Sequence, residues 1–94
     1  MGGRVALVTG GSRGIGAAVA MGLARDGHRV AVCWARDAEG GDRVRADIEA
    51  VGREALSLQA DVSDAAAVAA TFKQVEEAWG PVEVLVNSTW QLAV

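Results

Sequence analysis

Short runs of apolar residues recur along this chain, and they constrain its possible folds more than any other feature. They cover residues 5–8, 30–34, 55–60 and 82–86. The first two, VALV and VAVCW, are apolar at every position. A run without polar alternation is typical of a strand that is covered on both faces, as in a parallel sheet. The runs therefore predict four strands, the first two of them continuously apolar.

Helical periodicity fills the intervals between these runs. Apolar residues recur three or four positions apart there, which predicts a helix in each interval. The expected inner faces are Ile15, Val19 and Leu23; Val44, Ile48 and Val51; and Val68, Phe72, Val75 and Trp79. Alternating strands and helices with short connections predict an α/β fold with a parallel sheet and right-handed crossovers.

Residues 9–16, TGGSRGIG, join the first strand to the first helix. A helix amino terminus presents unpaired N–H groups and the positive end of its dipole, which favours a phosphate. Glycines let the backbone turn sharply and come close to a pyrophosphate. The segment therefore predicts a dinucleotide site, with a tight turn that binds nothing as the alternative. A P-loop is not expected, because no Gly-Lys-Ser or Gly-Lys-Thr follows.

Three motifs then resemble one family. TGGSRGIG has the TGxxxGxG form of the short-chain dehydrogenase/reductases, Asp61-Val62 matches their D-V motif, and Leu85-Val86-Asn87 matches the start of their N-N-A-G motif. The resemblance covers residues 4–87 and is strongest to bacterial 3-oxoacyl-[acyl-carrier-protein] reductases, through residues 26–30 and 80–86. It implies a partial Rossmann fold, β-α-β-α-β-α-β, with a parallel sheet in the order 3-2-1-4.

The resemblance also implies roles for individual residues. The backbone of residues 14–16 would hold the pyrophosphate, and residues 12–13 would lie against the adenosine ribose and its 2′ substituent. Asp61 would bond the adenine amino group with Val62 packed beside it, and Asn87 would line the ribose side. The candidate cofactor-binding residues are Gly10, Ser12, Arg13, Gly14, Ile15, Gly16, Arg36, Asp61, Val62 and Asn87.

Charge at the end of the second strand distinguishes the two nicotinamide cofactors. An NAD enzyme places a carboxylate there for the ribose 2′-hydroxyl, which would repel a 2′-phosphate. The family's acidic position falls on Trp34, the next on Ala35, and Arg36 follows, with Asp37 beside it. Arg13 supplies a second cation, so we expect NADP(H) rather than NAD(H).

The family's catalytic groups are not found in the sequence. The resemblance implies a Tyr proton donor with a Lys four residues on and a Ser, but the chain has no tyrosine and one lysine, Lys73. We therefore expect the chain to be the amino-terminal, cofactor-binding part of a reductase of 3-oxoacyl thioesters. We expect it to have no catalytic residue and to show no turnover alone. A stand-alone nucleotide-binding or regulatory module and a non-functional truncated product are the alternatives.

The expected boundary lies at Asn87. Residues 1–87 would form the amino-terminal half of a NAD(P)-binding domain, and residues 88–94 would form a tail unlike the family. Trp90 stands where the family has a glycine, so its indole would crowd the cofactor. The strand at residues 82–86 would leave an unpaired apolar edge, which predicts self-association.

Composition limits the remaining functions. The 94 residues are 51% hydrophobic and 22% charged, as in a single globular domain, and the net charge of −3 gives no reason to expect nucleic acid. No signal peptide or membrane-spanning run is visible, so a cytoplasmic location is expected. Cys33 is expected to be a buried core thiol and His28 a surface residue, and no metal cluster is apparent. The remaining expected partner is an acyl-carrier-protein or CoA thioester, as substrate of the completed enzyme.

Overall fold

The computed structural model describes residues 3–12 and 14–88. Arg13, one of the candidate cofactor-binding residues, lies outside the described residues. So does most of the expected tail, including Trp90, and its proposed crowding of the cofactor is not addressed by the structure.

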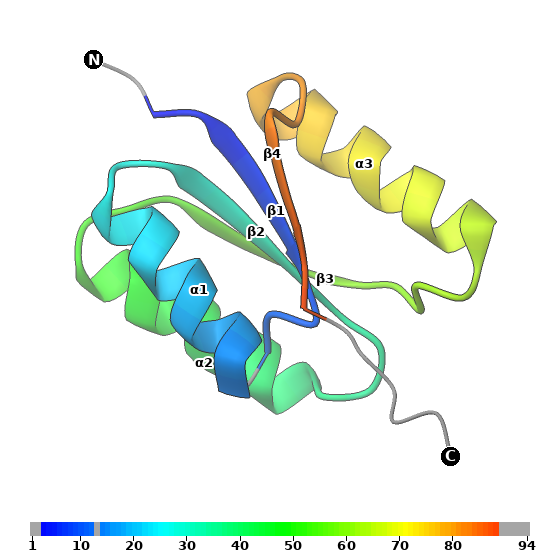
Figure 1. Cartoon of the computed structure of the whole chain (residues 1–94), viewed down its shortest axis with the longest axis horizontal. Coiled ribbons are helices and arrows are strands. Elements are labelled where there is room, and N and C mark those ends of the chain that lie inside the picture. The colour runs from blue at the N-terminus through cyan, green and yellow to red at the C-terminus, as the bar shows by residue number, and fades with distance from the viewer. Residues whose placement is uncertain (1–2, 13, 89–94) are drawn as a thin grey trace.

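The elements follow one another as strand and helix in strict alternation (Figure 1). They are β1 (Val5–Thr9), α1 (Gly14–Arg25), β2 (Arg29–Trp34), α2 (Ala38–Ala50), β3 (Ala55–Gln59), α3 (Ala65–Trp79) and β4 (Val84–Asn87). All neighbouring strands are parallel, in the order β3-β2-β1-β4, which confirms the predicted sheet. The predicted bounds of the fourth strand, residues 82–86, were wrong by one or two residues at each end. The strand begins at Val84 and ends at Asn87.

Helices cover both faces of the sheet. Figure 1 shows α1 and α2 on one face and α3 on the other. Ala6 and Val8 of β1 point toward α1 and α2, whereas Val5 and Leu7 belong to the cluster on the α3 side. This division explains why the first two strands lack polar alternation, since neither face meets water.

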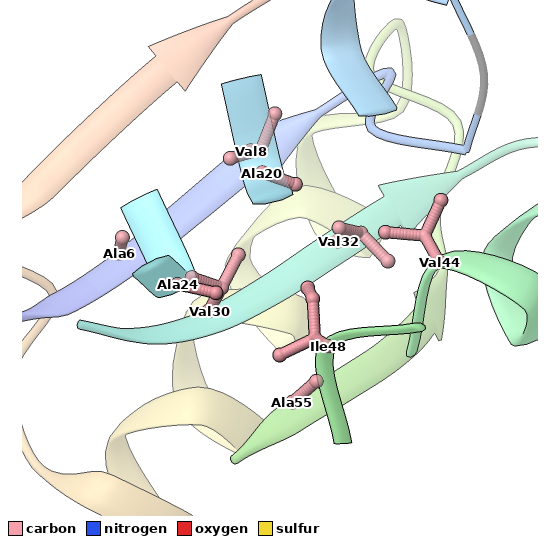
Figure 2. Packing of buried hydrophobic residues seen from close by; sticks show 9 residues of the cluster. All are labelled: Ala6, Val8, Ala20, Ala24, Val30, Val32, Val44, Ile48 and Ala55. Atoms are coloured by element: carbon pink, nitrogen blue, oxygen red, sulfur yellow. The ribbon is translucent and has the colours of Figure 1, made fainter. Parts of the chain in front are cut away.

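The cluster on the α1 and α2 side corrects the predicted inner face of α1. The residues of α1 that are buried are Gly16, Ala20 and Ala24, not Ile15, which is 72% exposed. Ala20 and Ala24 lie over β1 and β2 (Figure 2). Small residues every fourth position let the helix come close to the sheet, so Val19 and Leu23 are left at the flanks, half-buried.

The other two helices agree with the periodicity more closely. Val44 and Ile48 of α2 are buried as predicted, but Val51 is 47% exposed because it follows the last turn as the carboxyl-terminal cap. On α3, Val75 is fully buried and Trp79 packs partly against the same cluster. The structure adds Thr71 to the buried face of α3; its hydroxyl donates to the Ala67 carbonyl at 3.0 Å.

The small buried residues of α1 lead to a prediction on stability. Ala20→Leu forces extra volume between α1 and the sheet and should lower the free energy of unfolding by about 1–3 kcal/mol. Ala18→Leu makes the same change at an exposed position of α1 and should stay within about 0.5 kcal/mol of the parent. Urea denaturation of the 94-residue chain measures both. Equal effects of the two variants would show that Ala20 does not face the sheet.

Candidate functional site

The carboxyl ends of all four strands meet at one edge of the sheet. Thr9 pairs with Cys33 on one side and with Asn87 on the other, and Trp34 pairs with Gln59. The connection after β1 leads to β2, whereas β4 arrives on the opposite side of β1 after α3. Parallel sheets bind ligands at the carboxyl edge where the strand order reverses in this way.

The glycine turn at this point is shaped by its own backbone. The Gly10 and Gly11 N–H groups both donate to the Cys33 carbonyl, at 2.9 and 3.4 Å, which ties the turn to the end of β2. Gly10 has φ 70° and Gly14 has φ 60°, a region that side chains other than glycine rarely adopt. The chain can therefore leave β1, reverse, and enter α1 within five residues.

Gly16 has no room for a side chain. A Cβ there would overlap the Gly10 carbonyl oxygen and the Ser88 hydroxyl. The first turn of α1 thus lies directly against the glycine turn and the end of β4. Ser12, which is 7% exposed, lies on the other side of the turn, with its carbonyl oxygen close to Gly40 of α2.

The three helix amino termini differ in charge. The Asp37 carboxylate accepts a hydrogen bond from the Gly40 N–H at the start of α2, and the Asp64 carboxylate accepts from two amides at the start of α3. The first turn of α1 has no acidic residue. Since the first N–H groups of a helix have no partner within it, α1 is the helix whose start suits an external anion.

Side chains join the ends of β1 and β4. The Thr9 hydroxyl donates to Asn87 Oδ1 at 2.9 Å, and the Ser88 N–H donates to the Thr9 carbonyl at 3.0 Å. The Ser88 hydroxyl donates to the same carbonyl. Asn87 is therefore held beside the glycine turn, where the sequence placed it.

Asp61 lies just beyond β3 in an Asx turn. Its Oδ1 accepts from the Ser63 N–H at 2.9 Å and from the Ser63 hydroxyl at 2.7 Å. The Ser63 hydroxyl and N–H, and then the nearby Arg36 guanidinium, hold the pKa of the exposed Asp61 carboxyl below 3.8. Val62 is 42% exposed beside it, which leaves an apolar surface next to an ionised carboxylate.

The end of β2 has no carboxylate at the expected acidic position. Trp34 occupies it, and its indole Nε1 donates to the Ser57 hydroxyl on β3 at 2.8 Å. Arg36 follows in an exposed bend, and its positive charge favours the ionised form of Asp61. The nearest acidic side chain along the chain, Asp37, is held as the cap of α2.

Two residues that form hydrogen bonds at the carboxyl ends of the strands, Ser63 and Gln59, were not predicted. Ser63 stands two positions after Asp61, the usual spacing of an Asx turn, and that signal was available in the sequence. The Gln59 amide donates to the Ala35 carbonyl at 3.1 Å, and no spacing in the sequence indicates this contact.

Other expectations concern groups away from the edge. Cys33 is buried as predicted; its thiol donates to the Ala60 carbonyl at 3.4 Å, and burial raises its pKa. His28 Nδ1 accepts from the Arg4 N–H. Across the described ranges there is no group of three or more residues able to hold a metal ion. None of the described helices has both the length and the apolarity needed to cross a bilayer.

A parallel doubly wound sheet with a glycine turn at its switch point defines a dinucleotide-binding domain of Rossmann type. The family model for short chain dehydrogenases matches residues 4–89, and the chain belongs to that family. This confirms the resemblance that the three motifs indicated.

Individual relatives support this assignment. The chain is 45% identical over 83 residues to the 3-oxoacyl-[acyl-carrier-protein] reductase FabG of Staphylococcus aureus, covering 88% of this chain and 34% of the relative. A short chain dehydrogenase from Burkholderia cenocepacia in complex with NADP superimposes with a TM-score of 0.92 at 48% identity, covering 98% and 38% of the two chains. A blue fluorescent protein from a metagenomic library in complex with NADPH gives 0.92 at 40% identity, covering 98% and 38%. The chain spans 31–35% of the length of the curated relatives that it matches here.

The Asx turn gives a prediction on ionisation. Ser63→Ala removes the largest cause of the lowered Asp61 pKa, so that pKa should rise toward 3.8 while staying below it through the remaining Ser63 N–H bond. Arg36→Ala should raise it less. Carbon-13 NMR titration of the Asp61 carboxyl measures both.

The sign of the accompanying stability change follows from linkage. The folded state favours the carboxylate, so its contribution is present above pH 3.8 and is lost as the pH falls through the lowered pKa. An unchanged Asp61 pKa in Ser63→Ala would refute the role of the turn.

Proposed function

We propose that this chain is the NADP(H)-binding portion of a short-chain reductase that acts on 3-oxoacyl thioesters. The observation that carries the choice of cofactor is the end of β2, where Trp34 stands at the family's acidic position and Arg36 follows in an exposed bend. A guanidinium there would pair with a 2′-phosphate, and the carboxylate nearest along the chain, Asp37, is engaged through Oδ1 as the cap of α2.

The rest of the edge fits the same cofactor. Gly14 has φ 60° and nothing lies within 4 Å of the position that a Cβ would take there, so a pyrophosphate could approach the first-turn amides of α1. In the described residues, Asp61 Oδ2 has no hydrogen-bond partner and would accept the adenine amino group, while Oδ1 stays with Ser63. The exposed side chains of Ile15 and Val62 would lose apolar surface to the cofactor. Arg13, outside the described residues, would add a second cation.

The division of chemical work follows from these residues. The cofactor supplies hydride for reduction of a substrate carbonyl when bound. This chain's residues bind and orient it: the α1 amides hold the phosphates, Asp61 fixes the adenine, and Asn87, held by Thr9, lines the ribose side. The chain has no tyrosine, and Lys73 is exposed on α3, which lies across the sheet from α1. We infer that proton donation requires residues beyond those of this chain.

The substrate class rests on the FabG relative. The chain is 45% identical to that 3-oxoacyl-[acyl-carrier-protein] reductase over the aligned residues, and an acyl-carrier-protein or CoA thioester would be the substrate of the whole enzyme. We infer that the whole enzyme forms a 3-hydroxyacyl thioester.

The cofactor assignment predicts a selective loss. Arg36→Ala, alone or with Arg13→Ala, should weaken NADPH binding about 10- to 100-fold per arginine, as expected for a charge-assisted bond to phosphate. NADH binding should change less than about threefold, because NADH has no 2′-phosphate. Titration of the chain with each dinucleotide, followed by nicotinamide fluorescence, gives the two dissociation constants.

Two further results decide the assignment. Equal losses for NADPH and NADH would refute the role of the arginines, and no NADPH binding by the parent chain would refute the proposed function. In the same cuvette, acetoacetyl thioester should cause no NADPH oxidation, because a bound cofactor without a proton donor does not turn over. Turnover by the chain alone would show that another group donates the proton.

We also propose that the chain associates with itself through β4. Among the described residues β4 is an edge strand of the sheet, and its Leu85 side chain is 56% exposed. An unpaired apolar edge offers its backbone N–H and C=O groups to another strand.

Leu85→Lys places a charge on this edge and should shift the chain toward monomer in sedimentation velocity at a fixed concentration. Gln74→Lys, with the same change of charge at an exposed position of α3, is the matched control and should behave like the parent. A parent chain that stays monomeric across the accessible concentration range would refute self-association.

A further inference from the structure

The end of β3 holds the bend that carries Arg36. We propose that Gln59 is a positioning residue for cofactor selectivity: it fixes the Ala35–Arg36 bend, and thereby holds the Arg36 guanidinium where a 2′-phosphate would bind. The inference rests on the proposed NADP(H) binding and names a residue outside the glycine turn and the Asp61 motif on which the preference depends.

Besides the strand ladder, three hydrogen bonds from the β3 side reach Trp34 and Ala35 at the end of β2. The Ser57 hydroxyl accepts from the Trp34 indole at 2.8 Å, and the Ala60 N–H donates to the Trp34 carbonyl at 2.9 Å. The third is the bond from the Gln59 Nε2 to the Ala35 carbonyl at 3.1 Å. The first two hold residues within or next to the ladder, whereas the third reaches past the end of β2 into the bend itself.

Gln59 is therefore the β3 side chain that restrains the residue before Arg36. The bend is restrained on its other side by the Asp37 carboxylate, which accepts from the Gly40 N–H at 3.0 Å. Ala35 and Arg36 are both exposed, so packing does not fix their backbone. The carbonyl before Arg36 and the cap after it together determine where its side chain begins.

The charge of Arg36 also acts on Asp61. The Ser63 hydrogen bonds are the main cause of the lowered pKa of that carboxyl, and the Arg36 guanidinium lowers it further. Under this proposal, a bend held in this place keeps the cation where the adenosine 2′-phosphate would bind before a ligand arrives. Binding then requires less ordering of the bend and of a long flexible side chain, and such preorganisation raises affinity.

A matched pair of substitutions tests this. Gln59→Leu removes the amide donor at nearly constant size, and Gln74→Leu makes the same change at an exposed position of α3. Gln59→Leu should weaken NADPH binding about 3- to 10-fold, the effect of one neutral hydrogen bond, and change NADH binding less than twofold. Gln74→Leu should change neither.

The double variant Arg36→Ala/Gln59→Leu separates positioning from a general structural effect. Because Gln59 acts through Arg36, its substitution should have no further effect on NADPH binding once Arg36 is removed. Gln59→Met, which also lacks the donor, provides a second variant, and circular dichroism melting confirms that each variant is folded.

The outcomes distinguish the two proposals. A parent chain with no preference for NADPH over NADH would overturn both. A parent whose preference is lost in Arg36→Ala but kept in Gln59→Leu and Gln59→Met would overturn the role of Gln59 alone. Equal weakening of both dinucleotides by Gln59→Leu, or a loss that persists in the double variant, would also overturn it.

Discussion

The close contact between α1 and the end of β1 is the constraint on which the rest of this fold depends. Gly16 lies so near the Gly10 carbonyl and Ser88 that no Cβ fits. The same helix then continues across the sheet on Ala20 and Ala24, both fully buried. Small residues along the whole contact bring the helix axis close to β1 and β2. The amino terminus of α1 is thereby fixed at the switch point of the sheet, where its dipole and amides face the ligand edge.

The amino termini of the other two helices are capped by carboxylates, unlike the amino terminus of α1. Asp37 and Asp64 provide the anions for α2 and α3 from within the chain. Those caps stabilise the helices, and one of them, Asp37, is the carboxylate that follows the end of β2 most closely in the sequence. Asp37, one residue from Arg36 in the sequence, is thus oriented toward the start of α2, with its Oδ1 bonded to the Gly40 N–H.

Much of the fold could be predicted because its signals are local. Continuous apolar runs, helical spacing and the motifs gave the element order and the strand order 3-2-1-4, which the structure confirms. The inner face of α1 was predicted wrongly because periodicity favours large apolar residues, and Ile15 was chosen over Ala20 and Ala24. Close helix–sheet packing selects for small size instead, and the sequence does not show how near two elements lie.

The places of the candidate site residues in the fold were predictable to a similar degree, and for the same reason. Residues read from motifs, such as Gly16, Asp61 and Asn87, do lie at one edge of the sheet, because parallel strands bring their carboxyl ends together. The contacts that orient this edge were not predictable. The pairing of Gln59 with Ala35 joins residues 24 positions apart, and it depends on the register of β2 against β3.

That register would also let this edge distinguish two cofactors that differ by a single phosphate, as we propose. Trp34 pairs with Gln59, so the last residue of β3 lies opposite the last residue of β2. A long polar side chain at this position of β3 reaches the first carbonyl beyond the ladder, whereas a short one would end at the sheet. The charge that would read the 2′ substituent comes from β2, but the position of that charge depends on β3. Substitutions on a strand that never touches the phosphate are therefore expected to affect cofactor preference, and the size of their effect depends on how firmly they hold the bend.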